Sequence, residues 1–405
     1  MKHLRSKILI GLSRQEVSIE VVGIFWTTLY VKIGIWRMAG MKAEIGKDYP
    51  LRMAEKACKT LMNTYKAKDL PPTEKWHYHQ GVFLYGMYRV WEATGKREYF
   101  QYIKDYYDFL IDEEGNFLFA RDELDSIQPG ILLFPLYEKT GEKKYLIAAK
   151  KLRNLVNTIN KTSEQGFWHK DKYPYQMWLD GLFMAGPFLT KYSDYFHEPE
   201  LIQTVLYQEK LMTKHMCNKE TGLLYHAWDE KKEQPWSNPK TGCSPEVWGR
   251  SAGWYGAAII DILELLEGKS VGQEVLIEDL KAFISTMISY QDKETGLWYQ
   301  IIDKGDRDDN WLESSCSSLF IYIISKALKK GYVDNEKMQV VINGYTGLIK
   351  NMVEVTEKVL NLNGICIGTS AGTYDYYVSR PVSRNDLHGM GAFILASIAL
   401  YDLLQ

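Results

Sequence analysis

Six long apolar stretches with helical periodicity recur along this 405-residue chain, and each follows directly after a polar cluster. A helix that is apolar nearly all round has to be surrounded by protein, because any exposed face would leave apolar surface in water. If six such helices run parallel inside a closed ring, their polar N-terminal ends meet at one mouth. We expect the functional site at that mouth. The polar clusters lie at 77–79, 124–126, 177–180, 248–250, 313–315 and 385–388.

Amphipathic stretches alternate with the apolar ones and predict outer helices with one solvent-exposed face. They cover approximately residues 50–67, 97–112, 143–160, 198–217, 272–291 and 334–354. Six inner and six outer helices without a polar capping repeat predict an all-α (α/α)6 barrel, with an open α-solenoid as the alternative. Glycine-containing turns followed by aromatic or β-branched residues, such as 164–169 and 220–226, predict short β-hairpins at the mouth.

The composition argues against several classes of function. A formal net charge of −2 gives no electrostatic reason to bind nucleic acid or an anionic membrane. Most of the 28 Tyr and 12 Trp are expected to pack in the core, and we expect some rings to stack on the C–H faces of a sugar. The five cysteines form no CxxC pair and no Cys/His metal spacing, which predicts reduced thiols, a cytoplasmic location and no structural zinc.

Residues 1–40 lie outside the helical pattern. Their two apolar runs are interrupted by charged residues, which argues against both a signal peptide and a membrane span. We interpret this segment as an N-terminal extension without assigned function, with Met38 or Met41 as the natural start. The barrel is expected to occupy residues 41–405.

Two aspartates stand at equivalent helix openings: Asp180 in QMWLDGLFMAG and Asp125 in ELDSIQPG. An Asp at this position is most often an N-cap. In an apolar, Trp-lined pocket, however, a carboxyl group has a raised pKa and can donate a proton near neutral pH. Two carboxylates at one mouth are the usual groups for acid–base chemistry on sugars. We therefore expect both to be catalytic, with one pKa raised by the neighbouring charge.

His169 and His226 occupy matching places in the turns GFWH and GLLYH. The match indicates a role in the site, although one of them could be a hydrogen-bonded core histidine. No HExxH-type spacing is present, so we expect neither a metal nor a cofactor. Arg250, between Trp248 and Trp254 in EVWGRSAGWYG, either pairs with a core acid or holds the carboxylate of an acidic sugar in a bidentate contact.

Four segments resemble, in the right order, the unsaturated rhamnogalacturonyl hydrolases of glycoside hydrolase family 105. They read MWLDGLFMAGPF, WGRSAGWYGAAIIDILE, ESSCSSLFIYIISKALKKGYVD and GTSAGTYDYYVSRPVSRNDLHGMGAFILAS. The resemblance covers about residues 45–405 and implies an (α/α)6 barrel. It implies that Asp180 is the catalytic aspartate and Asp125 a second active-site aspartate. The residues that it places around the sugar are Tyr78, His169, His226, Trp248, Arg250 and Trp254.

The resemblance also implies a hydration reaction instead of ordinary glycoside hydrolysis. Such enzymes act on pectin oligosaccharides that a lyase has left with a C4=C5 double bond in the non-reducing-end galacturonyl residue. Asp180 would protonate C4 and then take a proton from the water that attacks C5, and 5-keto-4-deoxyuronate would leave. The alternatives are an unsaturated glucuronyl hydrolase for glycosaminoglycan fragments, a sugar epimerase and a carbohydrate-binding module. The aglycone and the oligomeric state remain open.

Overall fold

The computed structural model describes residues 46–118, 123–269 and 272–405. The chain divides into two units, Met1–Gly46 and Lys47–Gln405, and the second contains all the helices and strands named below. The interpretation of residues 1–40 as an extension, with a start at Met38 or Met41, lies outside the described residues.

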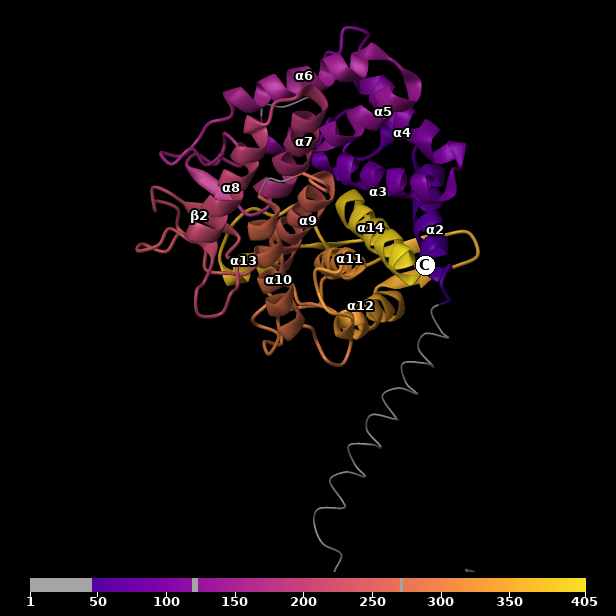
Figure 1. Ribbon diagram of the computed structural model, residues 1–405. Coiled ribbons are helices and arrows are strands. Elements are labelled where there is room, and N and C mark those ends of the chain that lie inside the picture. The colour runs from indigo at the N-terminus through magenta and orange to yellow at the C-terminus, as the bar shows by residue number, and fades with distance from the viewer. Residues whose placement is uncertain (1–45, 119–122, 270–271) are drawn as a thin grey trace, which may run out of the picture. The chain divides into compact units, whose positions relative to one another are not determined.

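The unit Lys47–Gln405 is a ring of inner helices surrounded by outer helices (Figure 1). The inner helices are α3 (Tyr78–Thr94), α7 (Gly181–Phe196), α9 (Gly249–Leu265), α11 (Ser314–Lys329) and α14 (Leu387–Leu404), with η2 (Leu124–Ser126), η3 (Gln128–Leu132) and α5 (Leu133–Thr140) in the second place. The outer helices are α2 (Tyr49–Thr64), α4 (Arg97–Leu110), α6 (Lys143–Thr158), α8 (Glu200–Met216), α10 (Gln273–Ser289) and α12 (Met338–Asn351).

The ring is closed. Each inner element contacts the next one along the chain, and the last, α14, contacts α3. Each outer helix packs on an inner neighbour, as α8 does on α7 and α10 on α9. The predicted (α/α)6 barrel is therefore confirmed, and the open solenoid is excluded.

The second inner element departs from the predicted continuous helix. Two 3₁₀ turns, η2 and η3, precede the short helix α5. Proline has no N–H to donate, so an α-helix beginning near residue 125 would lack the bonds expected at Pro129 and Pro135. With a start at Leu133, Pro135 falls in the first turn, where no such bond is needed.

The predicted hairpins at the mouth are present as short bridged turns. Isolated antiparallel bridges pair Ile111 with Phe117, Lys161 with Phe167 and Cys217 with Leu224. Antiparallel pairs join β1 (Gln176–Trp178) to β2 (Ala227–Asp229), β3 (Val353–Val355) to β4 (Leu360–Leu362), and β5 (Ile365–Cys366) to β6 (Val382–Ser383). The β1–β2 pair ties the segment before α7 to the segment before α9.

Helix α14 is the most apolar element of the barrel. By length and composition it is apolar enough to cross a membrane, yet 78% of its 18-residue window is buried inside the protein. It packs against α2, α3 and α11. Its contact with α3 is so close that a Cβ at Gly391 would lie 2.7 Å from the backbone nitrogen of Phe83. Packing inside the barrel therefore accounts for its apolar surface.

Candidate active site

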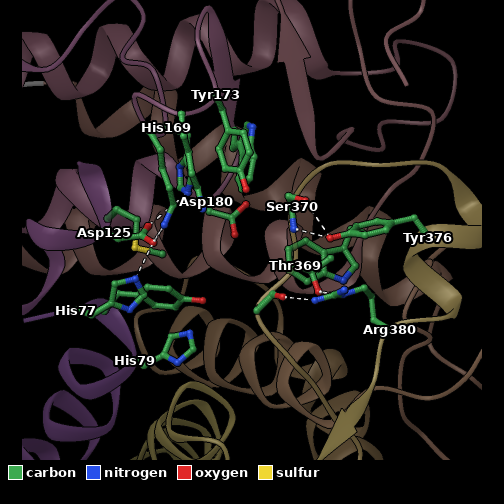
Figure 2. A pocket seen from close by; sticks show the side chains of 17 residues that line it. His77, His79, Asp125, His169, Tyr173, Asp180, Thr369, Ser370, Tyr376 and Arg380 are labelled. Carbon is green, nitrogen blue, oxygen red and sulfur yellow. Dashed lines mark hydrogen bonds and ion pairs between the residues drawn. The ribbon is translucent and has the colours of Figure 1, made fainter. Parts of the chain in front are cut away.

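A cavity of about 290 Å³ lies where the inner helices begin (Figure 2). His77, Asp180 and Trp248 stand at the N-caps of α3, α7 and α9, and all three line this cavity. The N-terminal ends of parallel helices carry partial positive charge, so the mouth favours anionic groups. The sequence prediction of a polar mouth is thus realised in the tertiary structure.

Asp180 holds the N-cap position of α7, but its side chain makes no capping hydrogen bond. The carboxyl group is only 7% exposed and faces the cavity. Its Oδ2 lies 3.4 Å from Nε2 of His226, which is longer than a usual hydrogen bond. The carboxylate therefore remains available for chemistry.

Tyr377 orients the His226 ring. The Tyr377 hydroxyl accepts the backbone N–H of Gly372 at 3.3 Å and lies 2.7 Å from Nδ1 of His226, to which it can donate its own proton. A neutral His226 that accepts at Nδ1 carries its proton on Nε2. This proton points to the side on which Asp180 lies.

The pKa of Asp180 is lower than its ordinary value, which overturns the expectation of a raised pKa. Burial acts to raise it, but the contact with His226 outweighs burial. In the protein without substrate, Asp180 is therefore a carboxylate at neutral pH. It has to gain a proton before it can act as an acid.

Asp125 is 2% exposed and surrounded by cationic and imidazole groups. Its carboxylate pairs with the Lys170 ammonium, and lies 3.1 Å from Nε2 of His77 and 3.4 Å from Nε2 of His169. Burial acts to raise its pKa, but Lys170 and His77 hold the pKa well below the ordinary value. The expectation that one of the two carboxyl pKa values is raised is therefore wrong, since both are lowered.

Aromatic rings form the walls of the cavity beside the aspartates. The His169 ring stacks on Trp178 with centroids 4.4 Å apart, and Tyr173 stacks on Trp178 at 4.7 Å. Burial lowers the pKa of His169 to about 4, so this ring is neutral at physiological pH. Tyr78 and Trp248 also line the cavity. These surfaces suit a sugar ring.

Arg250 lies elsewhere than expected. It is fully buried, does not line the cavity, and donates to the backbone carbonyls of Cys366 and, at 2.7 Å, of Ile367. Its guanidinium also covers the Trp248 ring at 4.4 Å. These two bonds hold the start of the 366–370 segment against α9, while Nε has no hydrogen-bond partner among the described residues.

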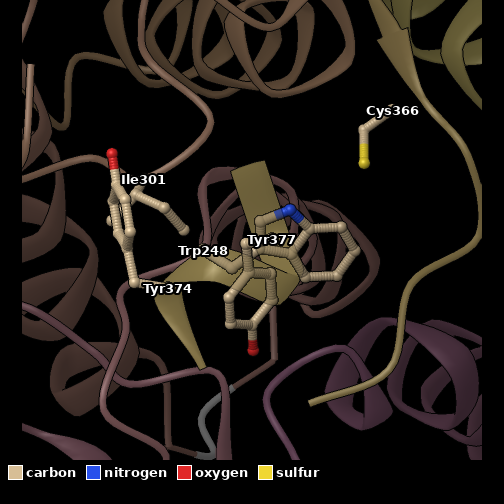
Figure 3. Close-up of a cluster of buried hydrophobic side chains, with 5 residues drawn as sticks. All are labelled: Trp248, Ile301, Cys366, Tyr374 and Tyr377. Carbon is tan, nitrogen blue, oxygen red and sulfur yellow. The ribbon is translucent and has the colours of Figure 1, made fainter. Parts of the chain in front are cut away.

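Trp254 and His226 also lie outside the cavity lining. The Trp254 ring stacks on Phe183 with centroids 4.6 Å apart and contacts the Tyr78 ring edge-on at 6.4 Å. It therefore packs behind a ring that lines the cavity. Buried side chains around Trp248 form the neighbouring cluster drawn in Figure 3, which includes Tyr377 and Cys366. Asp125, Asp180, His169, Tyr78 and Trp248 are the expected site residues that do line the cavity.

Several lining residues were not expected from the sequence. They are His77, His79, Lys170, Lys172, Tyr173, Trp178, Met184, Gly368, Thr369, Ser370, Tyr376 and Arg380. The cluster His77-Tyr78-His79 stood out as a polar opening, and Lys170 directly follows His169, so these had a local signal. The residues of the segment after β5 lie in the fourth resembling segment, but no repeat or periodicity places that segment over the mouth.

The described residues contain two groups of donor atoms that could hold a metal ion. They are His79 with Asp386 and His388, and His77 with Glu123 and Asp125. Sequence spacing did not indicate either one, because the donors come from distant parts of the chain. At the second group the Lys170 ammonium already contacts both carboxylates, so it competes with any added cation.

The family model of Glycosyl Hydrolase Family 88 matches residues 53–404. The chain therefore belongs to glycosyl hydrolase family 88, and it is a glycoside hydrolase of the group that families 88 and 105 form. A family-105 glycoside hydrolase from C. acetobutylicum ATCC 824 has a similar structure, with a TM-score of 0.82 and 34% identity over 87% of this chain and 99% of that one.

Two further proteins are similar to this chain. The unsaturated rhamnogalacturonyl hydrolase YesR of Bacillus subtilis (strain 168) is 27% identical over 249 residues, 60% of this chain and 68% of that protein. The unsaturated glucuronyl hydrolase of Bacillus sp. GL1 shares the fold, with a TM-score of 0.67 and 12% identity over 87% of this chain and 96% of that one. The family acts on unsaturated uronates, which implies an oligosaccharide substrate.

Proposed function

We propose that this protein hydrates the C4=C5 double bond of an unsaturated galacturonyl residue at the non-reducing end of lyase-generated rhamnogalacturonan oligosaccharides. The observation that carries the proposal is Asp180, a carboxylate at the N-cap of α7 that caps nothing and faces the cavity. The similarity to an unsaturated rhamnogalacturonyl hydrolase supports the choice of substrate. The products are 5-keto-4-deoxyuronate and a rhamnose-ended remainder.

Asp180 gains its proton when substrate binds. The carboxylate of the uronate and the loss of water from the cavity both disfavour a charged Asp180, so its pKa rises in the complex. Asp180 then protonates C4, and the cation that develops at C5 is shared with the ring oxygen. As a carboxylate it next takes a proton from the water that bonds to C5. The hemiketal opens between C5 and the ring oxygen, and C1 releases the aglycone as an alcohol.

Asp125 remains ionised throughout in this proposal. Its low pKa follows from the contacts with Lys170 and His77, and these hold a carboxylate under all but acidic conditions. We assign it to orienting His77, His169 and Lys170 around the sugar. Tyr78, Trp178 and Trp248 supply the apolar surfaces of the same site.

The sugar epimerase alternative has weaker support. An epimerase of this kind would use His169 and His226 as its acid and base. Both nitrogens of His226 face protein groups, Tyr377 at 2.7 Å and Asp180 at 3.4 Å, and the ring is fully buried. A cytoplasmic site of action is also part of the proposal, supported by five unpaired cysteines.

The test is to incubate the protein side by side with unsaturated galacturonyl-rhamnose and with an unsaturated chondroitin disaccharide. Loss of the ultraviolet absorbance of the conjugated double bond reports hydration. We expect faster loss with the galacturonyl substrate, together with release of rhamnose. Faster loss with the chondroitin disaccharide would favour the glucuronyl hydrolase, and interconversion of a free sugar without loss of absorbance would favour the epimerase.

A further inference from the structure

Arg380 is a cavity-lining cation that pairs with no carboxylate in the described parts of the chain. Its Nη2 donates to the Gly368 carbonyl at 2.7 Å, and its Nε donates to Oγ1 of Thr369 at 3.2 Å (Figure 2). The guanidinium also lies over the Tyr376 ring at 5.0 Å. These uncharged partners fix the direction of the guanidinium but leave its positive charge uncompensated.

Lys172 is a second cation of this kind on another part of the lining. Its ammonium lies over the Tyr173 ring at 4.9 Å, and no carboxylate within the described ranges pairs with it. Lys170, two residues earlier, differs because it pairs with both Asp125 and Glu123. The cavity thus holds one neutralised lysine and two cations, Lys172 and Arg380, that we call the rim pair.

The rim pair is more exposed to solvent than the two aspartates. Asp125 and Asp180 are buried, whereas Arg380 is half-buried and Lys172 is exposed. A non-reducing-end sugar that reaches Asp180 has to occupy the buried floor of the cavity. The rest of the oligosaccharide then leaves the cavity past the exposed residues, so the rim pair faces the aglycone.

We propose that the rim pair binds a second anionic group, carried by the aglycone. This inference rests on the proposed function and extends it, because it makes an acidic remainder the preferred substrate. A guanidinium matches the oxygens of a carboxylate or a sulfate ester, and a fixed guanidinium loses little freedom on binding. The anion is either the carboxylate of a further uronate or a sulfate ester on the neighbouring sugar.

The experiment measures kcat/KM on two matched pairs of substrates. One pair is unsaturated galacturonyl-rhamnose and the tetrasaccharide that carries a second galacturonate. The other is an unsaturated chondroitin disaccharide with and without a sulfate ester. Each pair gives a ratio of acidic to less acidic substrate, for the wild type and for Arg380→Gln, Lys172→Gln and Arg384→Gln. Arg384 is the control, because it pairs with Glu354 at 3.0 Å and does not line the cavity.

We expect the wild type to favour the more acidic member of at least one pair, and added salt to weaken that preference. Arg380→Gln should lower the ratio about 5- to 10-fold, as expected for a partly desolvated charge-assisted contact, and Lys172→Gln should lower it less because its ammonium is exposed. Arg384→Gln should leave the ratio unchanged. Because Lys172 is exposed, its variant tests the idea even if Arg380→Gln folds poorly.

The outcomes separate this inference from the proposed function. Suppose that unsaturated galacturonyl-rhamnose is hydrated, but that neither pair shows a preference or that Arg380→Gln keeps the wild-type ratio. The rim-pair inference is then overturned and the proposed function stands. A preference for the tetrasaccharide identifies a second uronate, and a preference within the chondroitin pair identifies a sulfate. If none of the four substrates is hydrated, both proposals fail.

Discussion

Asp180 is buried, yet its carboxylate makes no capping hydrogen bond to the helix that it precedes. It stands at a helix N-terminus without capping the helix, and His226 keeps its pKa low. A group in this state is set up to exchange protons with a ligand instead of stabilising the fold. The residue-scale predictions follow from that property.

Replacement of Asp180 by Asn removes the titrating proton and preserves the shape of the side chain. Positioned acid–base groups contribute about 10²–10⁴-fold, and here a single group acts in two steps, so the loss in kcat should reach the top of that range. Circular dichroism and ligand binding should remain close to wild type. A variant with a tenth of the wild-type activity would show that another group is the acid.

Tyr377→Phe tests how His226 is oriented. Without the hydroxyl proton, His226 can place its own proton on Nδ1 and turn a lone pair toward Asp180, which raises the pKa of Asp180. In the wild type, kcat/KM should fall as pH rises above the low pKa of Asp180, because only the protonated enzyme reacts. In the variant the falling limb should move to higher pH. A purely structural role of Tyr377 would lower activity at every pH without moving that limb.

Asp125→Asn should impair activity and move the same limb in the opposite direction. The substitution leaves the Lys170 ammonium without its nearest counter-charge, and an extra positive charge near the floor lowers the pKa of Asp180 further. The measurement is the pH dependence of kcat/KM beside the wild type. An unmoved limb would mean that Lys170 and Asp180 are not coupled through the cavity.

At the scale of elements, a buried carboxyl group links the outer helix α8 to the inner helix α9. The Tyr255 hydroxyl donates to Oε1 of Glu209 at 2.8 Å, and both side chains are buried. Burial raises the pKa of Glu209 to about 7. The folded barrel therefore favours the protonated form of Glu209, and ionisation of this carboxyl group weakens the contact between α8 and α9.

Glu209→Gln should make the barrel more stable above neutral pH. A carboxyl group whose pKa is raised by folding favours the folded state below its unfolded pKa, and this stability is lost as pH rises through the folded pKa. The free energy of unfolding of the wild type should thus fall relative to the variant between about pH 4.5 and pH 7, by about 3 kcal/mol in total. Denaturant unfolding of both proteins at several pH values measures the difference, in which other titrating groups cancel. A difference that does not change with pH would mean that Glu209 titrates normally.

At the scale of the whole molecule, the inner ring is complete within Lys47–Gln405. The contact between α14 and α3 closes it, and the family match begins at residue 53. The residues that line the cavity all lie between His77 and Arg380. The described ring and the residues that line its cavity therefore all lie within Lys47–Gln405.

A protein that begins at Met41 should fold, hydrate the substrate at the wild-type rate and show a similar Tm. The apolar runs of residues 1–40 should favour aggregation when exposed, so the shortened protein should express at least as well. Thermal melting and kcat/KM beside the full chain provide the check. A shortened protein that fails to fold would show that the segment covers part of the barrel.

The sequence by itself determined the alternation of inner and outer helices, because the width of the apolar face of a helix indicates how much of the helix is buried. It also indicated that Asp125, Asp180, Tyr78 and Trp248 share one mouth, since each stands at or just before the opening of an inner element, and it linked His169 to the site by its place in a recurring turn. These are local properties, repeated at regular intervals along the chain.

Only the tertiary structure decided the charge states and the partners. The pKa values of Asp125 and Asp180 depend on Lys170 and His226, which approach through space from other repeats. Arg250 was expected at the sugar, but its Nη1 and Nη2 donate to the carbonyls of Cys366 and Ile367, more than a hundred residues away in the sequence. Electrostatic contacts of this kind follow from three-dimensional distance, which a one-dimensional pattern does not contain.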